Sequence, residues 1–228
     1  MNNTNIYPFL KDFKPNAEID KWVIASYKKK SELAEKKAAY KLQKKFESSG
    51  VPRRYWHVDF DTYIPNTDKD SENLETIKKF SKLEKNDKVL LILGEHGLGK
   101  THLGSAIIRK CGGNFISLEG LILKYESAQD FHAKINREEL MDFYSSTQML
   151  VIDEIGRSMQ PDKENFLLNY ILRRRYENML PTVLISNLPK VDLLKKLGKA
   201  VFDRLKEICI TVEFEGESFR PSKRDVNL

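Results

Sequence analysis

The chain has 228 residues, of which 40% are hydrophobic and 32% charged, and this composition excludes collagen-like and low-complexity proteins. No apolar run approaches the roughly 18 residues that a membrane-spanning helix needs, and the first residues lack the layout of a secretory signal. The length favours one core domain with a short appendage. Because Cys111 and Cys209 are the only cysteines, no disulfide framework is expected, which favours a cytoplasmic protein.

The net charge of +6 is concentrated at the start of the chain. Residues 1–50 hold 11 lysines against six acidic residues, whereas the other 178 residues are close to neutral. This basic head predicts a polyanionic or acidic partner, although a solvated, lysine-rich helix face would give the same pattern.

Residues 18–48 predict one long helix or two, after a lead-in of 16 residues that we expect to be poorly ordered. The stretch contains neither Gly nor Pro, and its composition is strongly helix-forming. Such a helix buries little by itself and requires a partner surface. We therefore expect a helical partner-binding segment over residues 1–48, before a core domain over residues 49–228. The bulkiest apolar patch of the helix, and its predicted partner contact, is formed by Ile19, Trp22 and Val23.

After Pro52, short apolar strands alternate with amphipathic helices, a pattern that predicts a parallel sheet covered on both faces. Residues 65–87 are polar and predict a surface loop with one exposed helix. The expected strands are 88–93, 114–118, 149–153, 182–186 and 208–212, and the expected helices are 100–111, 119–126, 137–145, 163–178 and 190–206.

Residues 94–101 match the phosphate-loop pattern G-x-x-x-x-G-K-[ST] and lie between an apolar strand and a helix. The glycines allow backbone N–H groups to face a phosphate, and the helix N-terminus adds a positive end. Lys100 would neutralise the β- and γ-phosphates of ATP, and Thr101 would ligate Mg²⁺. The predicted nucleotide contacts are Gly94, Glu95, His96, Gly97, Leu98, Gly99, Lys100 and Thr101.

An apolar strand about fifty residues later ends in Asp153 and Glu154. Buried acids are rare unless they coordinate or pair, so Asp153 is a candidate Mg²⁺ ligand beside Thr101. Glu154 would polarise an attacking water, which indicates hydrolysis. Asn187 follows the next strand at the same sheet edge, where it could bind the γ-phosphate or cap a helix.

Several further stretches carry a resemblance to one family. They are residues 50–55 (GVPRRY) with Phe60 and Tyr63, 99–103 (GKTHL), 151–156 (VIDEIG), 174–187 (RR…PT…ISN), 202–205 (FDRL) and 214–220 (FEGESFR). Together they resemble the AAA+ ATPases and, within them, the DnaC/DnaI-like replicative helicase loaders, to which the insertion-sequence protein IstB is related. The likeness covers roughly residues 33–220.

The resemblance implies an α/β fold, an AAA+ P-loop core with a five-stranded parallel sheet in the order 5-1-4-3-2. The chain ends soon after Arg220, so we expect no C-terminal lid domain. The family pattern adds Arg54, Tyr55 and His102 to the nucleotide-binding residues. It also implies that Arg204 is an arginine finger for a neighbouring subunit and that Arg220 contacts the subunit's own nucleotide.

The region 119–145 corresponds to the helix pair that faces single-stranded DNA in this family, although ordinary helix packing would explain its aromatic residues equally well. The candidate DNA contacts are Lys124, Tyr125, Phe131 and Lys134.

The resemblance implies an ATPase that loads a DnaB-type ring helicase onto single-stranded DNA during replication initiation. It would use Mg²⁺ and ATP and would self-associate through ATP interfaces on the helicase. Two alternatives remain open: an IstB-like transposition ATPase acting on double-stranded DNA, and a non-hydrolysing ATP-binding adaptor. The expected catalytic residues are Lys100, Asp153, Glu154, Asn187, Arg204 and Arg220.

Overall fold

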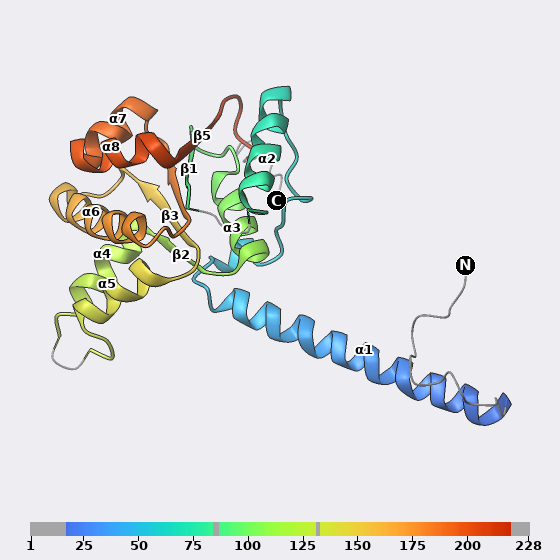
Figure 1. The fold of residues 1–228 in the computed structure, drawn as a ribbon. Helices are drawn as coiled ribbons and strands as arrows, with labels where there is room; N and C mark the ends of the chain where they lie inside the picture. The colour runs from blue at the N-terminus through green and yellow to red at the C-terminus, as the bar shows by residue number, and fades with distance from the viewer. Residues whose placement is uncertain (1–16, 84–86, 131–132, 220–228) are drawn as a thin grey trace, which may run out of the picture. The chain divides into compact units, whose positions relative to one another are not determined.

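The structure is a computed structural model that describes residues 17–83, 87–130 and 133–219 (Figure 1). It divides the chain into two units, Met1–Lys44 and Lys45–Leu228. Among the described residues, none of the helices has the length and apolar character needed to cross a bilayer.

The described part of the first unit is most of helix α1, Ala17–Glu47, so the predicted helical stretch forms one helix rather than two. Its apolar side chains at Ile24, Tyr27, Leu33 and Tyr40 are exposed. The side chains of Ile19, Trp22 and Val23 lie outside the described part of the chain.

The second unit is built on a five-stranded parallel sheet in the order β2-β3-β4-β1-β5, which is the predicted order. Most residues of the central strands are apolar, as expected for strands that are buried on both faces. The strands are β1 (Val89–Gly94), β2 (Asn114–Ser117), β3 (Leu150–Ile155), β4 (Thr182–Ser186) and β5 (Cys209–Phe214).

Helices cover both faces of this sheet (Figure 1). They are α2 (Asp68–Phe80), α3 (Lys100–Cys111), α4 (Leu118–Ser127), α5 (Arg137–Ser146), α6 (Pro161–Glu177), α7 (Lys190–Leu197) and α8 (Lys199–Ile208), with a short 3₁₀ turn at Arg53–Tyr55.

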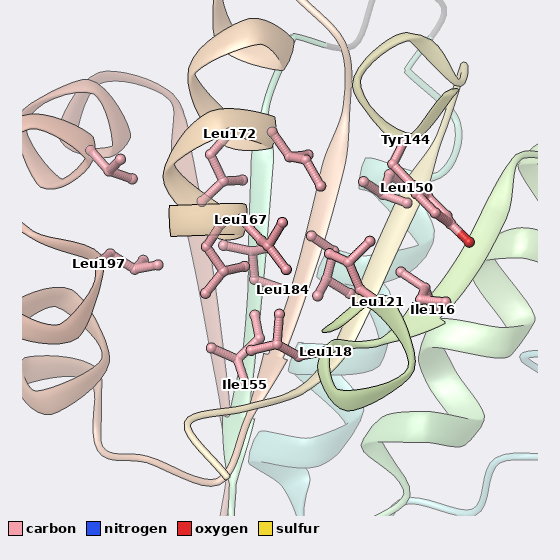
Figure 2. Close-up of a cluster of buried hydrophobic side chains, with 14 of the residues drawn as sticks. Ile116, Leu118, Leu121, Tyr144, Leu150, Ile155, Leu167, Leu172, Leu184 and Leu197 are labelled. Atoms are coloured by element: carbon pink, nitrogen blue, oxygen red, sulfur yellow. The ribbon is translucent and has the colours of Figure 1, made fainter. Parts of the chain in front are cut away.

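Two hydrophobic cores follow from the alternation of side chains along each strand. In β1, Leu91 and Leu93 face a core that includes α4 to α8, whereas Leu90 and Ile92 face a core that includes α2 and α3. Figure 2 shows the first of these cores, in which Leu167 of α6 lies beside Leu184 of β4.

Two expectations about helices were wrong. The helix predicted as exposed, α2, buries Leu74, Ile77 and Phe80 against the second core, because these side chains recur on one helix face. The single helix expected over residues 190–206 is two helices, because Gly198 adopts a φ of 80° between α7 and α8.

The parallel sheet brings the carboxyl ends of its strands to one edge. The register pairs Ser117 of β2 with Asp153 of β3, and Leu93 of β1 with Ser186 of β4. Residues that immediately follow β1, β3 and β4 therefore meet at this edge, where ligands of open α/β sheets bind.

Candidate functional site

A cleft of about 370 Å³ opens at the carboxyl edge of the sheet. Most of the residues that the sequence singled out for nucleotide chemistry line it, although Gly94 and Glu95 do not. The lining residues are Arg54, Tyr55, Val58, Thr62, Tyr63, Ile64, His96, Gly97, Leu98, Gly99, Lys100, Thr101, His102, Asp153, Glu154, Arg157, Asn187 and Phe219.

The phosphate loop turns sharply between β1 and α3. Gly97 and Gly99 have φ values of 84° and 79°, in the left-handed region that glycine adopts without strain. Lys100 is the first residue of α3, is only 6% exposed, and donates from Nζ to the carbonyl oxygen of Glu95 at 2.6 Å. The loop therefore places an ammonium group and the N-terminus of a helix on one wall of the cleft.

Thr101 and Asp153 meet on the floor of the cleft. The Thr101 hydroxyl donates to Asp153 Oδ2 at 2.7 Å, and the Glu154 backbone N–H donates to Asp153 Oδ1, also at 2.7 Å. Burial raises the pKa of Asp153 above its ordinary value, although these two hydrogen bonds act in the opposite direction. A cation bound here would favour the ionised carboxylate that burial disfavours.

The Thr101 hydroxyl and the Asp153 carboxylate fit a hard divalent cation, because Mg²⁺ takes one or two protein ligands and completes its shell with water and phosphate. Among the described residues, no group of three or more His, Cys, Asp or Glu side chains could hold a metal ion by itself. A cation at Thr101 and Asp153 would complete its shell with water and phosphate oxygens.

Glu154 has an unusual backbone for a residue with a side chain. Its φ is 60°, and its exposed carboxylate accepts from Arg157 Nη1 at 3.3 Å. This conformation lies at the end of β3, where the pairing with β4 shifts register between Ile152 and Ile155. A register irregularity of this kind re-aims a side chain next to a site.

Asn187 and His96 face each other across the mouth of the cleft. Asn187 Nδ2 lies 3.3 Å from His96 Nδ1, and both residues line the cleft. The helix-cap alternative is not seen, because α7 has Pro189 at its N-cap and no side-chain cap bond. The amide therefore lies at the end of β4 with His96, and not a helix N-terminus, as its neighbour.

Two segments from distant parts of the chain complete the walls. Tyr63 donates from its hydroxyl to Leu98 O at 3.3 Å, and its ring makes an edge contact with Phe219, whose centroid is 5.9 Å away. The Phe219 backbone N–H donates to Gly97 O at 3.0 Å. His102 Nε2 lies 3.0 Å from Asp59 O, so the ring holds segment 50–63 against α3.

Arg204 does not line this cleft. Its guanidinium lies over the ring of Tyr176, 5.9 Å from the centroid, on the side of the sheet covered by α6 and α8. Arg220 lies outside the described residues, directly after Phe219.

Two of the four candidate DNA contacts, Lys124 and Tyr125, pack against neighbours within the fold. Lys124 donates to the Tyr144 hydroxyl at 3.1 Å, and the Arg137 guanidinium lies 4.4 Å from the centre of the Tyr125 ring. Lys134 is exposed, whereas Phe131 lies outside the described part of the chain.

Sequence reasoning missed Arg157 as a cleft residue. Its position three residues after Glu154 was the available signal, but only the left-handed turn brings its guanidinium back to the Glu154 carboxylate. The aromatic wall at Tyr63 and Phe219 could be found only as part of the family resemblance, because no local pattern joins residues so distant in the sequence.

Comparison with known proteins agrees with this geometry. The chain matches the family model for IstB-like ATP binding proteins over residues 25–226. It is similar to the replicative helicase loader DnaC of Buchnera aphidicola subsp. Acyrthosiphon pisum, with 27% identity over 92% of this chain and 90% of that protein. The Escherichia coli K12 DnaC is 26% identical over 82% of this chain and 79% of that protein.

A crystal structure of the DnaC helicase loader has the same fold, with a TM-score of 0.63 and 26% identity over 72% of this chain and all of that chain. The resemblance predicted from the sequence is therefore confirmed. Since the family model spans most of the chain, and its phosphate loop and acidic pair line one cleft, the chain belongs to the IstB-like ATP binding protein family.

Proposed function

We propose that this protein is an ATP-dependent loader of a replicative ring helicase onto single-stranded DNA. The observation that carries the proposal is the convergence of the phosphate loop, Asp153, Glu154 and Asn187 on one cleft. The names of the curated relatives, which are replicative helicase loaders, support the same function. A cytoplasmic location follows from this role.

Each residue of the cleft has a separate role in the proposed hydrolysis of ATP. Lys100 faces the β- and γ-phosphates of the substrate, and Asn187 hydrogen-bonds the γ-phosphate from the opposite wall. Glu154 orients and deprotonates the attacking water. Mg²⁺, held by Thr101 and Asp153, would supply neutralisation of phosphate charge when bound.

The proposal also assigns residues to three binding partners: a neighbouring copy of the chain, single-stranded DNA and the helicase. Arg204, which lies away from its own cleft, would serve the cleft of a neighbouring copy, so that each ATP joins two subunits on the helicase. Exposed Lys134 and the basic N-terminal helix would contribute to binding single-stranded DNA and the helicase, respectively.

Hydrolysis is tested with two substitutions and a matched control. Lys100→Ala should abolish ATP binding, whereas Glu154→Gln should keep binding and lower turnover by about 10²–10⁴-fold. Lys110→Ala, at the exposed end of the same helix, should change neither. ATP binding without turnover in the unsubstituted protein would favour the adaptor alternative.

The loading function is tested by co-purification with the replicative helicase of the same organism, with and without ATP and single-stranded DNA. We expect ATP-dependent capture and a preference for single-stranded over double-stranded DNA. A preference for double-stranded DNA with no helicase capture would favour the transposition ATPase and contradict the proposal.

A further inference from the structure

The backbone that follows Glu154 is held from two sides. Ser186 of β4 donates from Oγ to Ile155 O at 2.8 Å, and the same Oγ accepts from Leu188 N at 3.0 Å. On the other side, the Gly156 N–H donates to Glu164 Oε1 of α6 at 2.7 Å. The two residues after Glu154 are thus fixed to two different elements.

The hydrogen bonds from Ser186 and Glu164 fix the backbone next to a strained residue. Glu154 has a φ of 60°, a conformation that side-chain-bearing residues keep only where the surroundings over-determine it. Gly156 packs closely against the residues after β4, because a Cβ atom there would lie 2.4 Å from Leu188 Cδ1. The hydrogen bond from Gly156 to Glu164 is one of the contacts that hold this turn.

Glu164 is a fully buried carboxylate that forms an ion pair with Lys196 of α7. Its exposure is 0%, and Lys196 Nζ lies 3.1 Å from Oε2, outside the geometry of a well-directed hydrogen bond. A buried charge persists only when it is paired. Packing alone does not require a carboxylate at this position. The carboxylate does supply a strong acceptor for the Gly156 N–H.

We propose that Glu164 is a positioning residue for Glu154. Its carboxylate, neutralised by Lys196, holds the Gly156 amide and so fixes the left-handed turn that presents Glu154 to the nucleotide cleft. The inference rests on the proposed hydrolytic function and adds to it a link from the catalytic turn to α7.

The test uses the full chain and two readouts. The first is amide hydrogen exchange over residues 154–160 in nucleotide-free protein, and the second is kcat and KM for ATP. Glu164→Ala should raise exchange in this segment by about tenfold or more, with β4 and α3 unchanged. It should lower kcat by between about 10-fold and 10²-fold at nearly constant KM.

Replacing both Glu164 and Lys196 by neutral residues distinguishes a positioning role of Glu164 from a role in folding. Glu164→Gln keeps an acceptor for Gly156 but leaves Lys196 without its counter-charge, so it should be impaired alone. Combining it with Lys196→Met removes the unpaired ammonium, whose side chain is 20% exposed, and should restore both slow exchange and turnover. Lys195→Met is the matched control, because Lys195 lies on the same helix with its side chain 74% exposed.

Unchanged exchange over residues 154–160 in Glu164→Ala would overturn the inference. So would a folded double variant with slow exchange and no recovery of kcat. If the unsubstituted protein bound ATP without turnover, the hydrolytic function would fail, and the exchange measurement would still decide whether Glu164 holds the turn. If Glu164→Ala did not fold, the glutamine variant and the double variant would decide.

Discussion

Gly97 lies so close to Ser218 that a residue with a Cβ atom would not fit there without a shift. A Cβ atom there would lie 1.9 Å from Ser218 Oγ, and the φ of Gly97 is 84°. The loop and segment 214–219 therefore approach each other through backbone at this point, which is why the Phe219 N–H reaches Gly97 O.

We expect Gly97→Ala to lower the free energy of unfolding by more than the roughly 1–2 kcal/mol that a left-handed alanine costs, and to weaken ATP binding. Ser218→Gly removes the atoms that the new Cβ would meet, so it should recover the part of the loss that exceeds the backbone cost. Thermal melts of Gly97→Ala with and without Ser218→Gly, and of Ser218→Gly alone, make the comparison. Equal losses from Gly97→Ala in the two backgrounds would contradict the contact with Ser218.

Asp153 gives a prediction about pH. Because burial raises its pKa in the folded protein, the ionised carboxylate destabilises the fold at pH values above that raised pKa. In metal-free buffer, Asp153→Asn should therefore raise the Tm at neutral pH. The advantage should shrink as the pH falls towards the ordinary Asp pKa of about 3.9 and vanish below it, where the carboxyl is protonated in both the folded and the unfolded state. A gain that is constant with pH would rule out the carboxylate charge as its cause.

At the level of the elements, Arg175 ties α6 to the amino-terminal side of the sheet. It is 1% exposed and donates to Thr182 Oγ1, Tyr144 O, Thr147 O and Pro181 O at 2.6–3.1 Å. A planar guanidinium can serve these acceptors together because its donors have a fixed fork geometry. The sequence points to Arg175 only through the family pattern, and its contacts give it a structural role.

Arg175→Lys should lower the free energy of unfolding by roughly 2–4 kcal/mol, because one ammonium group leaves several buried carbonyl oxygens without donors. Arg173→Lys on the same helix is the control. The Arg173 side chain is 66% exposed, so its replacement should change stability by less than about 0.5 kcal/mol. Chemical denaturation of the two variants compares them directly, and similar midpoints would contradict the assigned role.

The elements that could be predicted are those with local signals. Continuous apolar runs located every strand, and the phosphate-loop pattern located the start of α3 at Lys100. The burial of α2 was also readable from the spacing of Leu74, Ile77 and Phe80, but the surrounding polar residues concealed it. The break at Gly198 was missed because a glycine inside an amphipathic pattern does not by itself indicate a left-handed turn.

In the candidate site too, only the residues that belong to a local motif could be predicted from the sequence: Lys100, Thr101, Asp153 and Glu154. The hydrogen bonds of Ser186 and Glu164 join residues of different elements, and no sequence spacing indicates them. Arg204 and Arg220 entered through resemblance alone, and their roles stay predictions.

For the whole molecule, the boundary between the two units matters for experiments. Phe46 is 5% exposed, and the Arg109 guanidinium lies 4.2 Å from the centre of its ring. The Phe115 N–H donates to Ser49 O at 2.8 Å. The end of α1 therefore belongs to the core of the second unit, and a truncation intended to remove only the first unit should begin at Lys45.

A chain of residues 45–228 should fold and bind ATP but no longer capture the helicase, because the exposed apolar residues of α1 are removed. A chain of residues 49–228 should be less stable by about 3–5 kcal/mol, the usual cost of losing a buried Phe. Trp22→Ala in the full chain should weaken capture by at least about 2 kcal/mol if Trp22 anchors the interface. Helicase pull-down and nucleotide titration on the same preparations test these outcomes, and full capture by residues 45–228 would contradict the role of the helix.

Because of the hydrogen bond between Phe219 and Gly97, the nucleotide cleft can be completed only after the end of the chain has been synthesised. The two residues are 122 positions apart, and β5, which pairs with β1, is the last strand of the sheet. A ribosome-bound chain that has emerged only as far as β4 can contain a phosphate loop, but it has neither the final strand nor Phe219 beside the loop. Long-range parallel pairing of this kind forms slowly. Tight nucleotide capture should thus be a late event in biogenesis, and incomplete chains should compete poorly for cellular ATP.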